Sequence, residues 1–168
     1  ALDMGWKPDL SNRTWTNKKV AIIGAGPAGI GCADVLIRAG INCDVYDKHP
    51  EIGGLLTFGI PEFKLEKSVV RRRRKILEEM GIKFHLNKEV GKNISFKTLH
   101  EKYDAVFLGM GTYTSLKGGF IGEDLPQAHK AIDYLIGNTN HLLKFQQKES
   151  EYINFKGKEV VILGGGDT

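Results

Sequence analysis

Short apolar runs alternate along this chain with longer segments in which apolar residues recur at helical spacing. The runs predict β-strands at residues 19–23, 43–46, 82–86, 105–108 and 159–163. The first run, after Lys19, and the fourth run are continuously apolar, which is typical of strands buried in a parallel sheet. The longer segments predict helices at residues 27–39, 65–80, 95–102 and 128–143. Gly40 and Gly81 follow the first two helices, where glycine commonly ends a helix, and Ser95 is placed to cap the third.

The order of strand, helix and strand predicts an α/β domain with a Rossmann-like parallel sheet. The first strand runs directly into Gly24-Ala25-Gly26-Pro27-Ala28-Gly29, which opens the first helix. A GxGxxG string is a weak indication in a chain with 21 glycines, but its place between a strand and a helix is the one that dinucleotide binding requires. We therefore expect a nucleotide site here. The alternative is a strand–turn–helix corner that binds nothing.

Each glycine of this string has a physical role in holding a diphosphate. Gly24 permits the tight turn, Gly26 lets phosphates approach the backbone, and Gly29 lets the helix pack closely on the strand. The amides near Pro27 and Ala28 then face the anion at the positive end of the helix dipole. Pro27 lacks an N–H, which costs nothing at the first helical position.

An acidic residue follows the second predicted strand. Asp47 lies 23 residues after Gly24, near the spacing at which a carboxylate accepts the hydroxyls of an adenosine ribose. Its charge would repel a 2′-phosphate, so this first site suits FAD or NAD over NADP. The alternative for Asp47 is a solvated turn residue.

The segment after Asp47 favours FAD over NAD. Residues 48–63 form a loop with several glycines, whose amides could follow a long ligand. Leu55, Leu56 and Ile60 in this loop could bury a flat ring such as a flavin. A simple NAD-dependent dehydrogenase would usually continue from the second strand into a helix. A mobile surface loop is the alternative, because glycine and proline mark loops in every class of protein.

Composition narrows the function classes. The chain has 168 residues, of which 41% are hydrophobic and 26% charged, as in a globular domain with room for the start of a second. No apolar run approaches the roughly 20 residues that cross a bilayer, and the first residues lack the features of a signal peptide. We therefore expect a cytoplasmic protein with no membrane partner. Cys32 and Cys43 fit neither a metal-ligand pair nor a CxxC redox pair, so we expect two small buried hydrophobic residues, no metal site and no dithiol.

The net charge of +4 owes most of its excess to one basic block at residues 71–75. Five consecutive positions spread around more than one helical turn and make no single stripe, and no aromatic residues interleave with them. We expect a solvated helix with ion pairs to Glu66, Glu78 and Glu79 and no nucleic-acid partner, with a subunit contact as the alternative. We assign no catalytic role to any of the five histidines.

Longer segments of the chain resemble a known family. Residues 47–61, 63–67, 103–112 and the closing 164–168 are similar to the small (beta) subunit of bacterial NADPH-dependent glutamate synthase. The resemblance extends from about residue 5 to residue 168, and these motifs are far more specific than GxGxxG. The electron-input half of dihydropyrimidine dehydrogenase and NADPH–ferredoxin oxidoreductase subunits share them, so the subfamily stays open at this point.

The resemblance implies a glutathione-reductase-like pair of dinucleotide domains, the first for FAD and the second for NADPH. The positions that it assigns to cofactors group by the part of the ligand that they would meet. They are Gly24, Gly26, Pro27 and Ala28 for the FAD diphosphate, Asp47, Lys48 and Val90 for adenosine, Gly54, Leu55, Leu56, Gly59, Ile60 and Lys64 for the ribityl chain and flavin, Gly109, Gly111 and Thr112 for closure over the cofactor, and Gly164, Gly165, Gly166 and Asp167 for NADPH.

The resemblance also implies an activity. In this family NADPH passes a hydride to the flavin, single electrons then reach iron–sulfur clusters, and the large (alpha) subunit makes glutamate from glutamine and 2-oxoglutarate. Hydride transfer needs alignment and exclusion of water more than acid–base groups. We therefore expect an enzyme, and we expect no side chain of this chain to act as a catalytic acid, base or nucleophile. The alternatives are a related electron-input subunit, an NAD-only dehydrogenase, or a non-catalytic docking fragment.

The resemblance divides the chain into an N-terminal arm at residues 1–17, an incomplete FAD-binding domain at 18–156, and the start of an NAD(P)H-binding domain at 157–168. The arm resembles the tail of the family's iron–sulfur segment, whose ligand cysteines are not in this chain. The late segment that completes the flavin pocket in this family is also absent. We therefore expect a fragment that is inactive by itself.

Overall fold

A parallel four-stranded sheet forms the centre of the protein in a computed structural model that describes residues 4, 8–145 and 151–165. The strands are β1 (Lys19–Ile23), β2 (Asn42–Tyr46), β3 (Lys83–His85) and β4 (Ala105–Leu108), and their order in the sheet is β3-β2-β1-β4. Ile23 lies opposite Tyr46 on one side and Leu108 on the other, so three strands end at the same edge. This confirms the predicted α/β class and the first four predicted strands.

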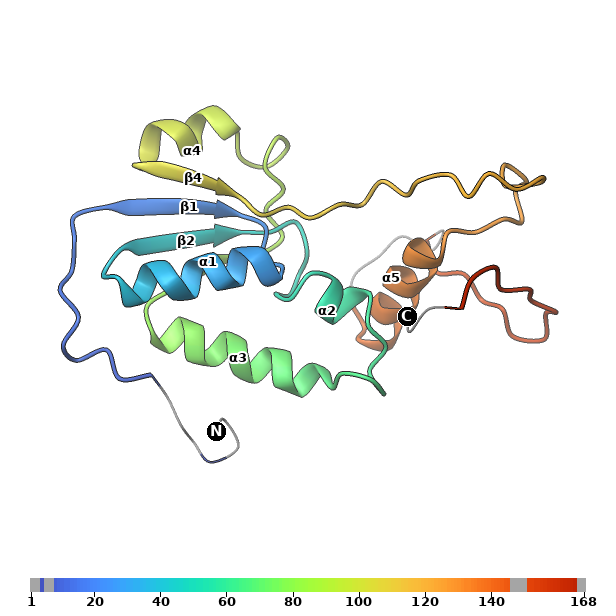
Figure 1. Cartoon of the computed structure of the whole chain (residues 1–168), viewed down its shortest axis with the longest axis horizontal. Helices are drawn as coiled ribbons and strands as arrows, with labels where there is room; N and C mark the ends of the chain where they lie inside the picture. Colours follow the sequence, from blue (N-terminus) through green and yellow to red (C-terminus); the bar gives the residue numbers. More distant parts are fainter. Residues whose placement is uncertain (1–3, 5–7, 146–150, 166–168) are drawn as a thin grey trace.

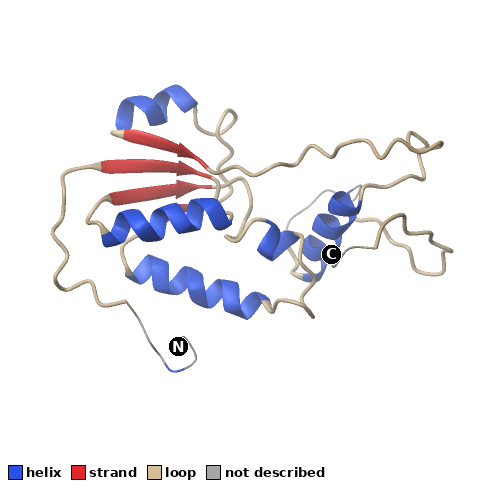
Figure 2. Ribbon diagram, in the orientation of Figure 1, coloured by secondary structure: helices blue, strands red, loops and turns tan. Residues whose placement is uncertain are grey.

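Helices cover both faces of the sheet (Figures 1 and 2). The helices are α1 (Pro27–Arg38), α2 (Leu55–Phe58), α3 (Lys67–Glu79), α4 (Phe96–Lys102) and α5 (Ala131–Leu142). The first and third lie on one face, α4 lies on the other, and α2 and α5 contact each other beyond the carboxyl ends of the strands (Figure 1). Within the described part of the chain, no helix has the length and apolar character needed to cross a membrane.

Two apolar clusters explain why β1 is apolar at each position after Lys19. Alternate residues of β1 point to opposite faces, so Ile22 packs in a cluster with α1 and α3, while Ala21 and Ile23 pack with Leu99 of α4. The residues predicted to end or cap helices do so. Gly40 and Gly81 follow α1 and α3 with positive φ angles of 76° and 104°. The Ser95 hydroxyl accepts a hydrogen bond of 3.0 Å from the Thr98 amide at the start of α4.

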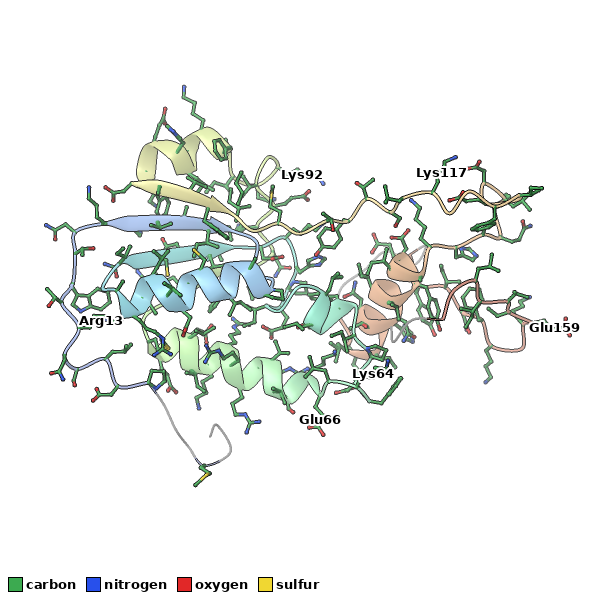
Figure 3. All side chains as sticks on the ribbon, viewed as in Figure 1. Arg13, Lys64, Glu66, Lys92, Lys117 and Glu159 are labelled. Atoms are coloured by element: carbon green, nitrogen blue, oxygen red, sulfur yellow. The ribbon has the colours of Figure 1, made fainter. Side chains whose placement is uncertain are left out.

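The N-terminal arm is fastened to the edge of the domain opposite the carboxyl ends of the strands. The Arg13 guanidinium donates hydrogen bonds of 2.8 and 3.4 Å to the Ile37 and Met80 carbonyls, at the ends of α1 and α3. It also stacks 3.5 Å from the centre of the Trp15 ring, and Figure 3 shows it beside this end of α1. Carbonyls at a helix C-terminus attract a cation, so one side chain holds the arm to two helices.

Three predictions about elements are wrong in part. The β4 strand is not buried, because it lies at the edge of the described sheet and α1 packs over β1 and β2. Phe107 is 37% and Leu108 56% exposed. Residues 159–163 form no strand in the described structure, since no neighbouring strand there supplies backbone partners, and Ile162 is 83% exposed. The loop at residues 48–63 contains the short helix α2.

The basic block lies on α3, and its ion pairs reach further than expected. Arg74 pairs with Glu78 at 2.8 Å, as predicted, but also with Glu51 at 3.1 Å. Arg73 pairs with Asp34 of α1 at 3.1 Å. The block therefore joins α3 to its neighbours as well as facing solvent, which the helical spacing of charges along one segment could not show.

Candidate nucleotide-binding site

The glycine loop sits where the ends of β1, β2 and β4 meet. Gly24 has a φ of 106° and donates its N–H to the Tyr46 carbonyl at 2.8 Å. A Cβ atom on Gly24 would lie 2.3 Å from the Gly109 oxygen, and one on Gly29 would lie 1.8 Å from the Gly24 oxygen. Both glycines are therefore required by backbone packing, one for the turn and one for the approach of α1 to the strand.

Gly26 differs from these two because nothing crowds it. It is the N-cap of α1, with an ordinary φ of −75°, and no side chain caps this end of the helix. A Cβ atom on Gly26 would meet only the Gly54 Cα, at 4.0 Å. The free amides at a helix N-terminus attract anions. The fold does not need a glycine at this position, but a ligand that approaches the backbone does.

The Asp47 carboxylate is held in place at the neighbouring strand end. The residue is 9% exposed, and its Oδ2 accepts a hydrogen bond of 2.6 Å from the Ala25 amide, while Oδ1 accepts one of 2.8 Å from the His49 amide. The carboxylate thus connects the glycine loop to the chain after β2. Each oxygen keeps further acceptor capacity, so hydroxyl groups of a ligand can still donate to it.

A cleft of about 220 Å³ opens above this carboxylate. Five positions assigned to FAD from the sequence line it, and they are Gly24, Asp47, Lys48, Val90 and Gly111. Of the six further lining residues, Met110 lies within the segment from Gly109 to Thr112 that was expected to close over the cofactor. The other five were not predicted, and they are Ile23, Tyr46, Lys88, Glu89 and Tyr113. Lys88 and Glu89 directly precede Val90, and Tyr113 directly follows Thr112. The sequence therefore indicated these residues only through their position next to an assigned residue.

Tyr113 brings an aromatic ring to the mouth of the cleft. The Lys48 ammonium lies 4.2 Å from the centre of this ring, and the Tyr113 hydroxyl lies 3.4 Å from Nε2 of His49. Burial raises the pKa of Tyr113, and the nearby Asp47 charge adds to this effect. Burial also lowers the pKa of His49, although Asp47 opposes the change. Lys48 and Lys88 give the cleft two cationic groups that suit an anionic ligand.

The loop after Asp47 packs against the glycine loop. The Gly53 amide donates to the Ala25 carbonyl at 2.7 Å, and Gly54 has a φ of 52° and approaches Gly26 closely. The Gly53 and Gly59 amides are used within the protein, by Ala25 and by Leu55 of α2. Contrary to the expectation from the sequence, these two amides are therefore not free to donate hydrogen bonds to a ligand, because they already donate to carbonyls of the glycine loop and of α2.

The remaining assigned positions do not line the cleft. On α2, Leu55 is 41% exposed and Leu56 is half-buried. Ile60, which is half-buried, and Lys64, which is exposed, lie on the segment between α2 and α3, and Figure 3 labels Lys64 there. Gly164 and Gly165 are exposed and have no atom within 4 Å of a Cβ position. Gly166 and Asp167 lie outside the described residues.

The cysteines show no features of a redox pair. Both are free, Cys43 is buried as expected and Cys32 is half-buried. Burial raises the pKa of Cys43 to about 12, with smaller effects from Asp44 and Cys32, so its thiol is unreactive at neutral pH. Across residues 4, 8–145 and 151–165, histidine, cysteine and acidic side chains form no group of three that could hold a metal ion.

Comparison with known proteins matches this geometry to a family. Residues 18–168 fit the family described as pyridine nucleotide-disulphide oxidoreductase. The chain belongs to this family. Among solved structures, FprA of Mycobacterium tuberculosis in complex with NADPH superposes with a TM-score of 0.67 and 27% identity, over 75% of this chain and 30% of FprA. The family match and this neighbour support binding of FAD or NADPH by a domain of this kind.

Two curated relatives align with the whole length of this chain. The NADPH-dependent glutamate synthase small chain of Halomonas elongata is 62% identical over 168 residues. The Escherichia coli protein AegA, whose name assigns it to the oxidoreductases, is 57% identical over 169 residues. The chain spans 36% of the length of the first relative and 26% of the second.

Proposed function

We propose that this chain is the FAD-binding part of an NADPH-dependent oxidoreductase of the glutamate synthase small-chain type. The observation that carries the proposal is the arrangement around Gly26. An uncapped helix N-terminus opens beside a space that no side chain fills, and the buried Asp47 carboxylate lies at the adjacent strand end. Diphosphate binding needs the first feature and ribose binding needs the second.

The residues present fit FAD. The amides at the start of α1 would hold the diphosphate, and Lys48 and Lys88, which line the cleft, would balance its charge. Asp47 would accept hydroxyls of the adenosine ribose and so orient this end of the cofactor. The loop that carries α2 lies against the glycine loop at Gly26, and its leucines would exclude water from the flavin. FAD would supply the redox chemistry by accepting a hydride from NADPH.

Further parts of the function rest on similarity to the small chains. The glycines at 164–166 with Asp167 begin an NADPH site, and the chain is divided at 1–17, 18–156 and 157–168 into arm, FAD domain and NADPH domain. By the same similarity, electrons from FAD would pass to iron–sulfur clusters outside this chain and serve a large subunit that forms glutamate from glutamine and 2-oxoglutarate. The 62% identity over the whole chain to a glutamate synthase small chain supports this assignment.

A second candidate keeps the same cofactors but changes the electron acceptor. The 57% identity to AegA is nearly as high, and it covers the same residues. The residues around Gly26 and Asp47 would bind the adenosine diphosphate part of FAD, so they do not indicate which molecule accepts the electrons. Activity of the full-length protein with glutamine and 2-oxoglutarate, in the presence of the large subunit, distinguishes the two candidates.

The FAD site is tested by titration of the full-length protein and of Gly26→Val with FAD, followed by flavin absorbance and calorimetry. A side chain on Gly26 occupies the place of the diphosphate, so we expect affinity to fall at least about tenfold, which is about 1.4 kcal/mol. Gly31→Val is the matched control, because Gly31 is exposed on the same helix with nothing within 4 Å of its Cβ position. Equal FAD affinity in Gly26→Val and the control would refute the site.

A further inference from the structure

Lys67 is a buried lysine in the first turn of α3, and the proposed cofactor chemistry does not use it. The residue is only 2% exposed. Its ammonium donates hydrogen bonds to the carbonyl oxygen of Leu56, at 2.9 Å, and to that of Ile60. Lysine is almost never fully buried without a partner, because removing its charge from water is costly. A buried ammonium with two carbonyl partners therefore has a specific task in this fold.

The two carbonyls lie at the C-terminal end of α2. A helix leaves its last carbonyls without backbone partners, and a cation near them is favourable. The α2 helix spans only Leu55–Phe58, which is too short to be stable by itself. The Gly59 and Ile60 amides both donate to the Leu55 carbonyl, at 2.9 Å. Lys67 supplies the partners that the end of this turn lacks.

The other end of the same segment is attached to the glycine loop. The Gly53 amide donates to the Ala25 carbonyl at 2.7 Å. The Thr57 hydroxyl donates to the Ile52 carbonyl at 2.5 Å. The segment from 53 to 60 is therefore held at its start by the glycine loop and at its end by the Lys67 ammonium. Burial lowers the pKa of this ammonium, while the charge of Glu62 opposes the change.

We propose that Lys67 is a positioning residue that holds the Leu55–Ile60 segment in the conformation needed to bind the flavin end of the cofactor. This inference rests on the proposed binding of FAD. It separates the site into two halves, because Lys67 donates its hydrogen bonds to Leu56 and Ile60, and neither of these residues lines the cleft around Asp47. Loss of the ammonium loosens the flavin half and leaves the adenosine half intact.

The test compares FAD with ADP, a ligand that has only the adenosine diphosphate half. In the full-length protein, Lys67→Met should bind FAD at least about tenfold more weakly and ADP with unchanged affinity. The visible absorbance of the bound flavin should change as its surroundings loosen. Hydrogen exchange of the amides at residues 58–60 should quicken, while exchange in α1 stays the same. Lys75→Met, an exposed lysine on the same helix, should match the wild type throughout.

Two outcomes would overturn the role of Lys67. Equal FAD affinity in Lys67→Met and Lys75→Met means that the ammonium does not position the flavin segment. A parallel loss of FAD and ADP affinity means that Lys67 only supports the fold. If Lys67→Met does not fold, Lys67→Gln, which keeps one donor without the charge, is measured in the same way and must show the same split. A wild-type protein that binds ADP but not FAD refutes the proposed function and not the tie between Lys67 and α2, which the exchange at residues 58–60 still reports.

Discussion

Replacing Gly29 by alanine tests the geometry on which the glycine loop depends. A Cβ atom there would lie 1.8 Å from the Gly24 oxygen and 3.2 Å from the Ile22 side chain. Helix α1 must withdraw by about 1.2 Å to bring the first contact to 3.0 Å, the shortest distance that such atoms show. Inserting a group into a packed site costs about 1–3 kcal/mol, and the upper end applies because the obstacle is backbone.

A loss of about 3 kcal/mol is large beside the roughly 5–15 kcal/mol that stabilises most proteins. With a urea dependence of about 2 kcal/mol per molar, the midpoint of unfolding should fall by about 1.5 M. Urea titration followed by circular dichroism and tryptophan fluorescence measures this change. The α1 helix should also lie further from the loop, so both FAD affinity and stability should fall in Gly29→Ala. In Gly26→Val, by contrast, FAD affinity should fall without this loss of stability.

Gly31→Ala is the control, because Gly31 lies two residues further along the same helix and is exposed. No atom lies within 4 Å of its Cβ position, so the substitution only reduces the freedom of the unfolded chain. It should stabilise the protein by about 0.4–1 kcal/mol. Opposite signs for the two changes are the expected result. A Gly29→Ala midpoint within about 0.3 M of the wild-type value would show that the close approach of α1 to the strand is not required.

Two further predictions concern stability away from the cleft. Arg13→Met removes a guanidinium from the C-terminal carbonyls of α1 and α3, so the free energy of unfolding measured in urea should fall by about 2 kcal/mol. Arg13→Lys should recover part of this loss. A loss below about 0.5 kcal/mol in Arg13→Met would mean that Arg13 does not hold the arm to the two helices. Burial opposes ionisation of Asp44, but hydrogen bonds from Tyr103 and Lys19 outweigh it and hold the pKa of Asp44 below its ordinary value. The stability that this carboxylate contributes is therefore present above about pH 4 and is lost as the pH falls through its lowered pKa. The difference in unfolding free energy between the wild type and Asp44→Asn should narrow on acidification from about pH 6 to pH 3, and a difference that stays constant would contradict this reasoning.

Local pattern in the sequence determined much of the fold and the centre of the candidate site. Runs of apolar residues located four strands, and Gly40, Gly81 and Ser95 marked helix ends, because these features depend on neighbours along the chain. The spacing from Gly24 to Asp47 likewise placed a glycine turn and a carboxylate at adjacent strand ends, since parallel strands in a βαβ unit end at the same edge.

Only the tertiary structure decided which other groups join them. Lys88 and Tyr113 reach the cleft from separate segments, because the strand order β3-β2-β1-β4 brings their loops together. Residues 159–163 look like a strand in sequence, yet a strand exists only where another supplies its hydrogen bonds. The burial of Lys67, in a sequence where Lys64 and Lys75 are exposed, follows from the position of two carbonyls on another segment, and no pattern along the chain records that.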